Sequence, residues 1–184
     1  LSDETAHRLL MGQGAALTRI DPREALDKMQ QAYDGYPAQR TPESEQQLLE
    51  AYLALDNTAR ARALVMDIEA RVRQQPVDGP RLQRAALAWG DYLYARSDYR
   101  AAADAFDLAL EWGASDSPDL WWMKFQRANA LFRLSDIEGS VALFDEVAAA
   151  ATPWAEQAAL MADYARLEQR LRGLPVTAQP KSAG

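Results

Sequence analysis

Acidic side chains at helical spacing and a single histidine are the residues of this sequence that could support acid–base or metal chemistry. Asp104, Asp107 and Glu111 follow one another at i, i+3 and i+7, so they share one helical face and could bind a cation or act as an acid–base pair. The opposite face of that segment is apolar, which favours the alternative that the three carboxylates form a solvated outer face. His7 has no second imidazole or cysteine with which to complete a zinc site, and we expect it to face solvent. The sequence therefore predicts no metal, no cofactor and no enzyme activity.

Two other patterns resemble binding motifs without meeting their requirements. Four arginines fall on one predicted helix and could form a basic patch: Arg60, Arg62, Arg71 and Arg73. Asp67 and Glu69 interleave with them, so we expect local salt pairs instead. The segment 12–14, Gly-Gln-Gly, has no strand before it and no Gly-Lys-Ser/Thr after it, and it is therefore not a phosphate-binding loop.

The composition limits the partners of the chain. Its 184 residues carry a formal net charge of −7, so the molecule as a whole repels phosphate backbones and anionic lipid, and we expect no nucleic-acid partner. No apolar run approaches about 18 residues, so we expect no direct membrane insertion in this segment. Cysteine is absent, which excludes disulfides, thiolate metal sites and cysteine nucleophiles. Arginine greatly outnumbers lysine in an alanine-rich sequence, an association that suggests a bacterial source.

Capping residues mark where helices begin. A capping side chain followed by proline occurs at Asp21-Pro22, Thr41-Pro42, Ser117-Pro118 and Thr152-Pro153. The cap oxygen accepts a free N–H at such a site, and proline has no N–H to lose. The pairs Asp21/Glu24 and Ser135/Glu138 have the spacing of capping boxes. No alternating strand pattern is present, so the signals predict nine helices and no sheet, over residues 4–19, 22–35, 42–55, 57–75, 81–95, 98–112, 118–133, 136–151 and 153–172.

The helices repeat in pairs. The second helix of each pair carries a small residue, a large residue four positions later and a further core residue three positions after that. The four copies are Ala25-Met29-Ala32, Ala61-Val65-Ile68, Ala102-Phe106-Ala109 and Ser140-Phe144-Val147. Such residues lie on one helical stripe, where small side chains allow the partner helix to approach closely. The same offsets align Gln13, Leu49, Gly90 and Ala128 on the first helices, and the large Gln13 and Leu49 predict looser crossing in the first two pairs.

The third copy, Gly90…Leu93…Tyr99…Ala102…Phe106…Ala109, resembles the tetratricopeptide repeat (TPR) family. The resemblance covers roughly residues 5–150, with longer spacings than the family period of about 34 residues. It implies an all-α, right-handed α-solenoid of about four TPR-like helix pairs whose first helices line a concave groove, with a C-terminal capping helix. We therefore expect one domain over residues 1–174, with repeats at 5–37, 41–76, 81–115 and 118–151, a capping helix at 153–172 and a flexible tail at 175–184.

The resemblance also implies which side chains face the groove. In the first two pairs these are His7, Leu10, Gly14, Leu17, Glu43, Gln46, Glu50 and Leu53. In the last two pairs they are Arg84, Leu87, Asp91, Tyr94, Trp122, Phe125, Asn129 and Phe132, and these eight are the predicted partner-binding residues. Aromatic and arginine side chains on a concave wall are typical of a peptide anchor site. The alternative is that Trp121, Trp122 and Phe125 pack beneath the capping helix.

These patterns predict a binding function. We expect a non-enzymatic protein–protein interaction scaffold that binds a peptide or a partner-protein segment in the groove, as a module of a larger bacterial assembly or export complex. One alternative is a passive spacer or homo-oligomerisation segment. Another is the regulatory arm of an enzyme encoded elsewhere in a longer chain. For location, the bacterial periplasm or cell envelope is favoured over the cytoplasm, because bacterial TPR modules often serve such machines and cysteine is absent.

Overall fold

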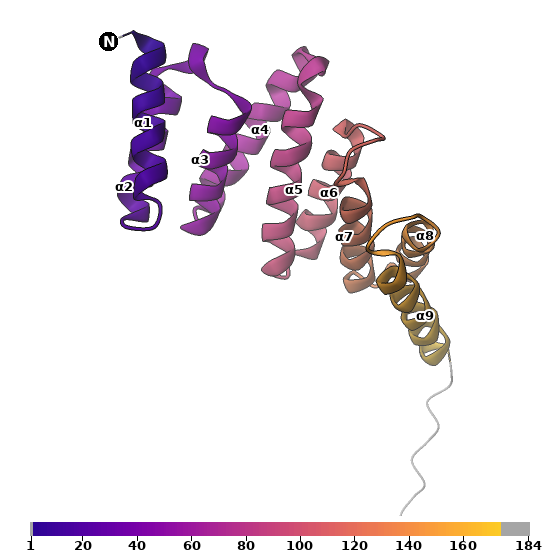
Figure 1. The fold of residues 1–184 in the computed structure, drawn as a ribbon. Helices are drawn as coiled ribbons and strands as arrows, with labels where there is room; N and C mark the ends of the chain where they lie inside the picture. The colour runs from indigo at the N-terminus through magenta and orange to yellow at the C-terminus, as the bar shows by residue number, and fades with distance from the viewer. Residues whose placement is uncertain (1, 174–184) are drawn as a thin grey trace, which may run out of the picture. The chain divides into compact units, whose positions relative to one another are not determined.

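The computed structural model describes residues 2–173 and contains the predicted helices (Figure 1). The α-helices are α1 (Asp3–Leu17), α2 (Pro22–Gly35), α3 (Pro42–Ala54), α4 (Thr58–Gln74), α5 (Gly79–Ala95), α6 (Tyr99–Trp112), α7 (Leu120–Arg133), α8 (Ile137–Ala148) and α9 (Ala155–Arg172). Two single-turn 3₁₀ helices, η1 (Pro37–Gln39) and η2 (Pro76–Asp78), precede α3 and α5. No strand occurs between residues 2 and 173, which agrees with the predicted all-α class.

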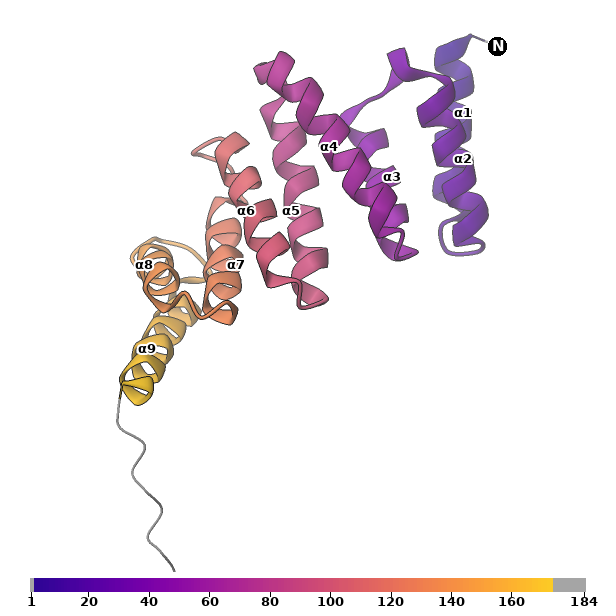
Figure 2. The ribbon, with the colours of Figure 1, turned by 180° about the vertical axis from the view of Figure 1, so that it is seen from behind.

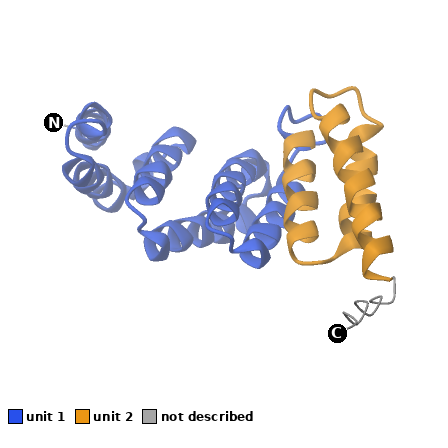
Figure 3. Cartoon of the chain, turned by 90° about the horizontal axis from the view of Figure 1, so that it is seen from below, with its two compact units in different colours: residues 1–120 blue, residues 121–184 orange. Residues whose placement is uncertain are grey.

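The chain divides into two compact units, residues 1–120 and residues 121–184 (Figure 3). Unit 1 holds the pairs α1/α2, α3/α4 and α5/α6, and each of its helices contacts the next one along the chain. The first helices of these pairs face the viewer in Figure 1, and the second helices face the viewer in Figure 2. Unit 2 holds α7, α8 and α9. The single domain over 1–174 stays a prediction, and the predicted tail at 175–184 lies outside the described residues.

Helix starts follow the capping chemistry, with three corrections. Asp21 and Thr41 cap α2 and α3 as predicted, each accepting backbone N–H groups of the first turn. Helices α7 and α9, however, begin two residues after the predicted Pro118 and Pro153, at Leu120 and Ala155. The hydroxyls of Ser117 and Thr152 instead accept from backbone N–H groups two residues later, which forms a turn before each helix.

The third correction concerns the turns within the helix pairs. Asp56, Ser97 and Ser135 each adopt a positive φ, between 56° and 65°. The next residues along the chain are Asn57, Asp98 and Asp136, and each donates its backbone N–H to the carbonyl five positions earlier, as in a Schellman motif. The side chains of the same three residues cap the helices that follow, α4, α6 and α8. The cap of α8 is therefore Asp136, and the predicted capping box of Ser135 with Glu138 does not form.

The third pair packs as the repeat pattern predicts. Gly90 lies so close to Phe106 that a β-carbon on it would come within 2.6 Å of the ring. Phe106 has no exposed surface, and Ala102 and Ala109 beside it are equally buried. A glycine on the first helix thus accommodates a phenylalanine on the second, and this contact sets how closely α5 and α6 approach.

The first and second pairs solve the same packing problem differently. In the first pair the small residue is Gly14, whose added β-carbon would lie 2.6 Å from Met29. The internal alignment of the repeats placed Gln13 at this position and was therefore one residue out of register. In the second pair Leu49 and Val65 are both buried in the core, so a larger residue on the first helix faces a smaller one on the second. The predicted looser crossing is therefore wrong for the first pair, where Gly14 allows close approach, but it is confirmed for the second pair, because α3 and α4 contact each other much less extensively than α5 and α6 do.

Unit 2 has its own core, built from aromatic rings and alanines. The Phe125 ring of α7 lies edge-on to Phe144 of α8, with centroids 5.7 Å apart. Helix α9 packs on α8 through the fully buried Ala158, Ala162 and Ala165. The predicted capping helix therefore exists, as a helix that covers α8 with small side chains.

Candidate functional site

The predicted binding stripe of α5 lies on one helical face. Arg84, Leu87, Asp91 and Tyr94 are spaced i, i+3, i+7 and i+10; Arg84 is exposed and the other three are half-buried. The Tyr94 ring packs edge-on against Tyr99 at 5.3 Å. This stripe offers surface to a partner, and its binding role stays a prediction.

The predicted residues of α7 are placed differently. Phe125 is only 4% exposed, and its ring stacks at 6.0 Å on Trp154, just before α9. The Trp122 ring lies 4.6 Å from the same Trp154. This is the packing that the sequence left open as the alternative to a groove. Phe125 thus supports the core of unit 2 and has almost no surface to offer a partner.

The last two predicted residues of α7 are half-buried. Asn129 donates its side-chain N–H to the Phe125 carbonyl at 3.0 Å. The Phe132 ring lies 5.6 Å from Tyr164 of α9. Both side chains already make contacts inside unit 2, and neither is an isolated anchor.

Between α1 and α3, the first-helix face of unit 1 is hollowed in two places. One hollow of about 340 Å³ is lined by His7, Glu43, Ser44 and their neighbours, and a second of about 430 Å³ lies farther along the same two helices. His7 was predicted to face solvent, but it is only 7% exposed and its Nε2 atom has no hydrogen-bond partner among the described residues. The sequence alignment missed this because the first pair is shifted by one residue, which turns His7 toward α3.

The buried His7 gives a pH prediction. Burial lowers the pKa of His7, so the folded chain keeps the imidazole neutral while the unfolded chain begins to protonate it. The unfolded state then binds more protons, and stability present above the unfolded pKa of about 6.5 is lost as the pH falls toward the lower folded value.

We therefore expect the urea midpoint of the wild type to fall more, between about pH 7.5 and about pH 5, than that of His7→Gln. The other charged residues that line the same hollow, Glu4, Arg8 and Glu43, are identical in the two proteins. Equal falls in the two proteins would contradict a neutral buried imidazole.

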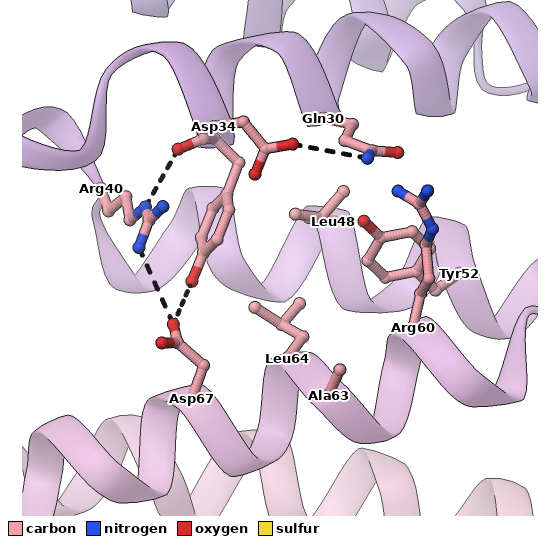
Figure 4. A pocket seen from close by; sticks show the side chains of 10 residues that line it. Gln30, Asp34, Arg40, Leu48, Tyr52, Arg60, Ala63, Leu64 and Asp67 are labelled. Atoms are coloured by element: carbon pink, nitrogen blue, oxygen red, sulfur yellow. Dashed lines mark hydrogen bonds and ion pairs between the residues drawn. The ribbon is translucent and has the colours of Figure 1, made fainter.

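A third hollow, of about 400 Å³, lies between the second helices α2 and α4 (Figure 4). Its floor is formed by Leu48, Tyr52 and Leu64. Its polar walls come from α2, from the segment after η1 and from α4: Gln30, Tyr33, Asp34, Arg40, Arg60 and Asp67. We call this hollow the α2–α4 furrow.

A satisfied polar cluster holds one end of the furrow rigid. The Tyr33 hydroxyl donates to Asp67 at 2.8 Å. Arg40 stacks its guanidinium over the Tyr33 ring at 3.8 Å and donates to the Tyr33 carbonyl at 3.0 Å. Burial and the hydrogen bond to Asp67 raise the pKa of Tyr33, so the phenol stays a neutral donor. The ring and both charges are thereby fixed before any partner arrives.

The same cluster continues into the interior through Arg71. Arg71 donates to Glu45 at 2.6 Å and to the Tyr33 hydroxyl at 3.2 Å. Glu45 belongs to α3 and is 1% exposed, and its second oxygen lies 3.1 Å from Arg81 Nε of α5, close but not aligned as a hydrogen bond. One buried carboxylate therefore joins α3, α4 and α5 directly beneath the furrow wall.

The other end of the furrow is open. Arg60 is exposed, and Figure 4 shows its guanidinium directed from α4 toward α2, where Gln30 and Asp34 lie. Burial raises the pKa of Tyr52, and the hydrogen bond and positive charge of Arg60 partly offset this. A guanidinium at the mouth of an apolar floor can bind a carboxylate.

The furrow has a repeat-related counterpart between α4 and α6. Its hollow of about 470 Å³ has Trp89 and Leu93 in the floor, at the positions of Leu48 and Tyr52 one repeat earlier. The sequence prediction placed the binding surface on the first helix of each pair only, and it therefore missed the hollows between α2 and α4 and between α4 and α6. The residues of the α2–α4 furrow come from four separate segments, so no spacing within one helix indicates them.

The remaining candidates behave as local surface groups. Asp104, Asp107 and Glu111 are exposed, as predicted for a solvated outer face. Arg71 pairs with Asp67 and Arg73 with Glu69 along α4, so the predicted local salt pairing is confirmed for these two of the four arginines. Across residues 2–173, no cluster of three or more metal-ligating side chains is found. None of the described helices is both long and apolar enough to span a bilayer.

Comparison with known proteins bears on the fold alone. No family profile matches the chain, and no curated protein sequence matches it. The nearly identical TPR-like repeats of a Podosopora anserina protein assigned as a kinesin light chain share this architecture, with a TM-score of 0.68 and 14% identity over 94% of this chain and 90% of that one. A crystal structure of a variant of those repeats gives a TM-score of 0.64 and 15% identity over 94% and 96%. The chain therefore has a TPR-like fold, and the predicted all-α solenoid class is confirmed.

Proposed function

We propose that this TPR-like chain is a non-enzymatic protein-interaction scaffold whose partner segment lies in the α2–α4 furrow. Stacked helix pairs present extended binding surfaces. The observation that carries the site is the hollow itself, in which two arginines, Arg40 and Arg60, stand on the walls beside an apolar floor. Arginine is enriched among the residues that dominate binding energy at protein interfaces.

The furrow is also organised in advance. The hydrogen bonds and ion pairs of Tyr33, Arg40 and Asp67 hold one wall in place, so little conformational entropy is lost when a partner binds. The apolar floor suits one large side chain, and Arg60 at the mouth suits a carboxylate next to it. The preferred segment is therefore one in which an acidic residue adjoins an aromatic or aliphatic one.

The competing site, the biological role, the location and the alternative function of the chain are also proposals. The first-helix stripe of α5, with Arg84, Leu87, Asp91 and Tyr94, is the competing site within the same scaffold function. A role in a bacterial assembly or export complex and a location in the periplasm or cell envelope rest on composition and on the family resemblance. A passive spacer remains the alternative function, and it requires that neither face binds.

Peptide selection followed by paired arginine variants tests the furrow. Random peptides of about 12 residues are selected on the chain of residues 1–184, and the affinity of the enriched peptides is measured by fluorescence anisotropy. We expect Arg60→Ala to weaken binding about tenfold, the effect of losing one hydrogen bond to a charged group, about 1.4 kcal/mol.

Arg84→Ala is the matched control, because it removes an exposed arginine from the α5 stripe. The furrow assignment predicts that this variant binds within about twofold of the wild type. Loss of binding in Arg84→Ala with full binding in Arg60→Ala would move the site to the first-helix face. Failure to enrich any peptide would favour the passive spacer.

A further inference from the structure

Helix α9 has two apolar faces, and α8 covers only one of them. Ala158, Ala162 and Ala165 lie at i, i+4 and i+7, are buried, and form the face that packs on α8. On the opposite side, four large side chains form a second stripe: Leu160 is 65% exposed, Leu167 51% and Leu171 58%, and Tyr164 is 54% exposed although its ring also contacts Phe132 of α7. Terminal helices of repeat arrays ordinarily carry a polar outer face. The outer face of α9 is apolar instead.

The exposed stripe has the spacing of a coiled-coil seam. Its residues follow one another at intervals of 4, 3 and 4, which places Leu160 and Leu167 at d positions and Tyr164 and Leu171 at a positions of a heptad. We call this set the α9 seam. It runs most of the length of an 18-residue helix, and such a seam is completed by a second helix with the same periodicity.

We propose that the α9 seam of a second copy of this chain covers it, with the two helices antiparallel. In this arrangement Tyr164 packs against Leu167 of the other copy and Leu160 against Leu171. The same register brings the flanking g positions, Asp163 and Arg170, together across the interface, and by two-fold symmetry it does so twice.

The charged residues beside the α9 seam favour an antiparallel over a parallel pairing of the two helices. A parallel dimer would place Asp163 beside Glu168 of the other copy, because g and the following e position meet in that arrangement, and two carboxylates repel. In the antiparallel dimer each Asp163 meets an arginine. Arg170 has no ion-pair partner within the part of the chain that the structure describes, and the Asp163 side chain is 80% exposed beside its intrachain partner Arg166. Glu168 is already paired with Arg172.

The interface is small, so the dimer should be weak. Four side chains per copy bury less surface than the roughly 1,200–2,000 Å² of a stable specific complex. We therefore expect a dissociation constant on the order of micromolar. Self-association therefore depends on protein concentration, and it acts through unit 2, whereas the α2–α4 furrow belongs to unit 1.

Sedimentation velocity of the chain of residues 1–184, from about 1 to about 200 µM, tests the proposal. We expect a concentration-dependent monomer–dimer equilibrium. Leu167→Asp should abolish the dimer without loss of helicity, since Leu167 is half exposed in the monomer. Asp163→Arg and Arg170→Asp should each weaken the dimer about tenfold, and the two substitutions combined should restore it.

Gln169→Glu is the control, because Gln169 is exposed on α9 but lies outside the seam. It should dimerise like the wild type. A chain that stays monomeric at all concentrations, a dimer that survives Leu167→Asp, or a charge swap that fails to restore association would each overturn the proposal. Peptide binding in the furrow is measured independently, so either proposal can fail alone.

Discussion

Replacement of Glu45 by alanine is expected to lower the free energy of unfolding of unit 1 by about 3–5 kcal/mol. The Glu45 side chain is 1% exposed and lies between two arginines, Arg71 at 2.6 Å and Arg81 at 3.1 Å. Removing the carboxylate leaves both guanidinium groups without their central counter-charge in a partly buried position. Because the three residues come from α3, α4 and α5, the loss also weakens the register between the second and third helix pairs.

Urea denaturation followed by circular dichroism checks this prediction, with Glu50→Ala as the matched control. Glu50 is exposed on the same helix and accepts one hydrogen bond from Gln46, so its loss should cost no more than about 0.5 kcal/mol. Replacing the pair, as Glu45→Leu with Arg71→Met, should recover much of the stability lost in Glu45→Ala, since apolar groups of similar volume often substitute for a buried ion pair. A Glu45→Ala variant within about 1 kcal/mol of the wild type would show that the buried charge contributes little.

Phe106→Ala is the second large effect, with an expected loss of about 3–5 kcal/mol from unit 1. The ring is completely buried, and three of its atoms would lie within 3.1 Å of a β-carbon on Gly90. Deleting the ring leaves a cavity next to a residue that has no side chain to fill it. The exchange Gly90→Leu with Phe106→Val, which copies the Leu49 and Val65 arrangement of the second pair, should recover part of the loss.

Hydrogen exchange measured by mass spectrometry locates the damage. Phe106→Ala should increase exchange in α5 and α6, and the repeat-equivalent Phe144→Ala should increase it in α7 to α9, because each phenylalanine is a core residue of its own unit. Equal increases throughout both units for either variant would contradict separate cores. Unchanged exchange in α5 and α6 of Phe106→Ala would contradict the packing role of the ring.

Local chemistry made the helices predictable. Asp21 and Thr41 cap their helices as expected, since a cap requires only a side-chain oxygen and the next three residues. The errors arose where two local solutions compete. The hydroxyls of Ser117 and Thr152 can either cap a helix or close a turn before it. Ser135 does not cap α8, because it adopts a positive φ and the next residue, Asp136, occupies the N-cap position.

By itself, the sequence determined the all-α class, the pairing of helices and the stripe of Ala102, Phe106 and Ala109, because the 3.6-residue period is a property of each helix alone. Only the tertiary structure decided which faces are covered. It buried His7 through a one-residue shift and packed Phe125 beneath Trp154. It also joined Tyr33, Arg40, Asp67 and Glu45 into one cluster beside the α2–α4 furrow. Those contacts link residues from different helices, and the periodicity of one helix carries no information about which side chain another helix presents to it.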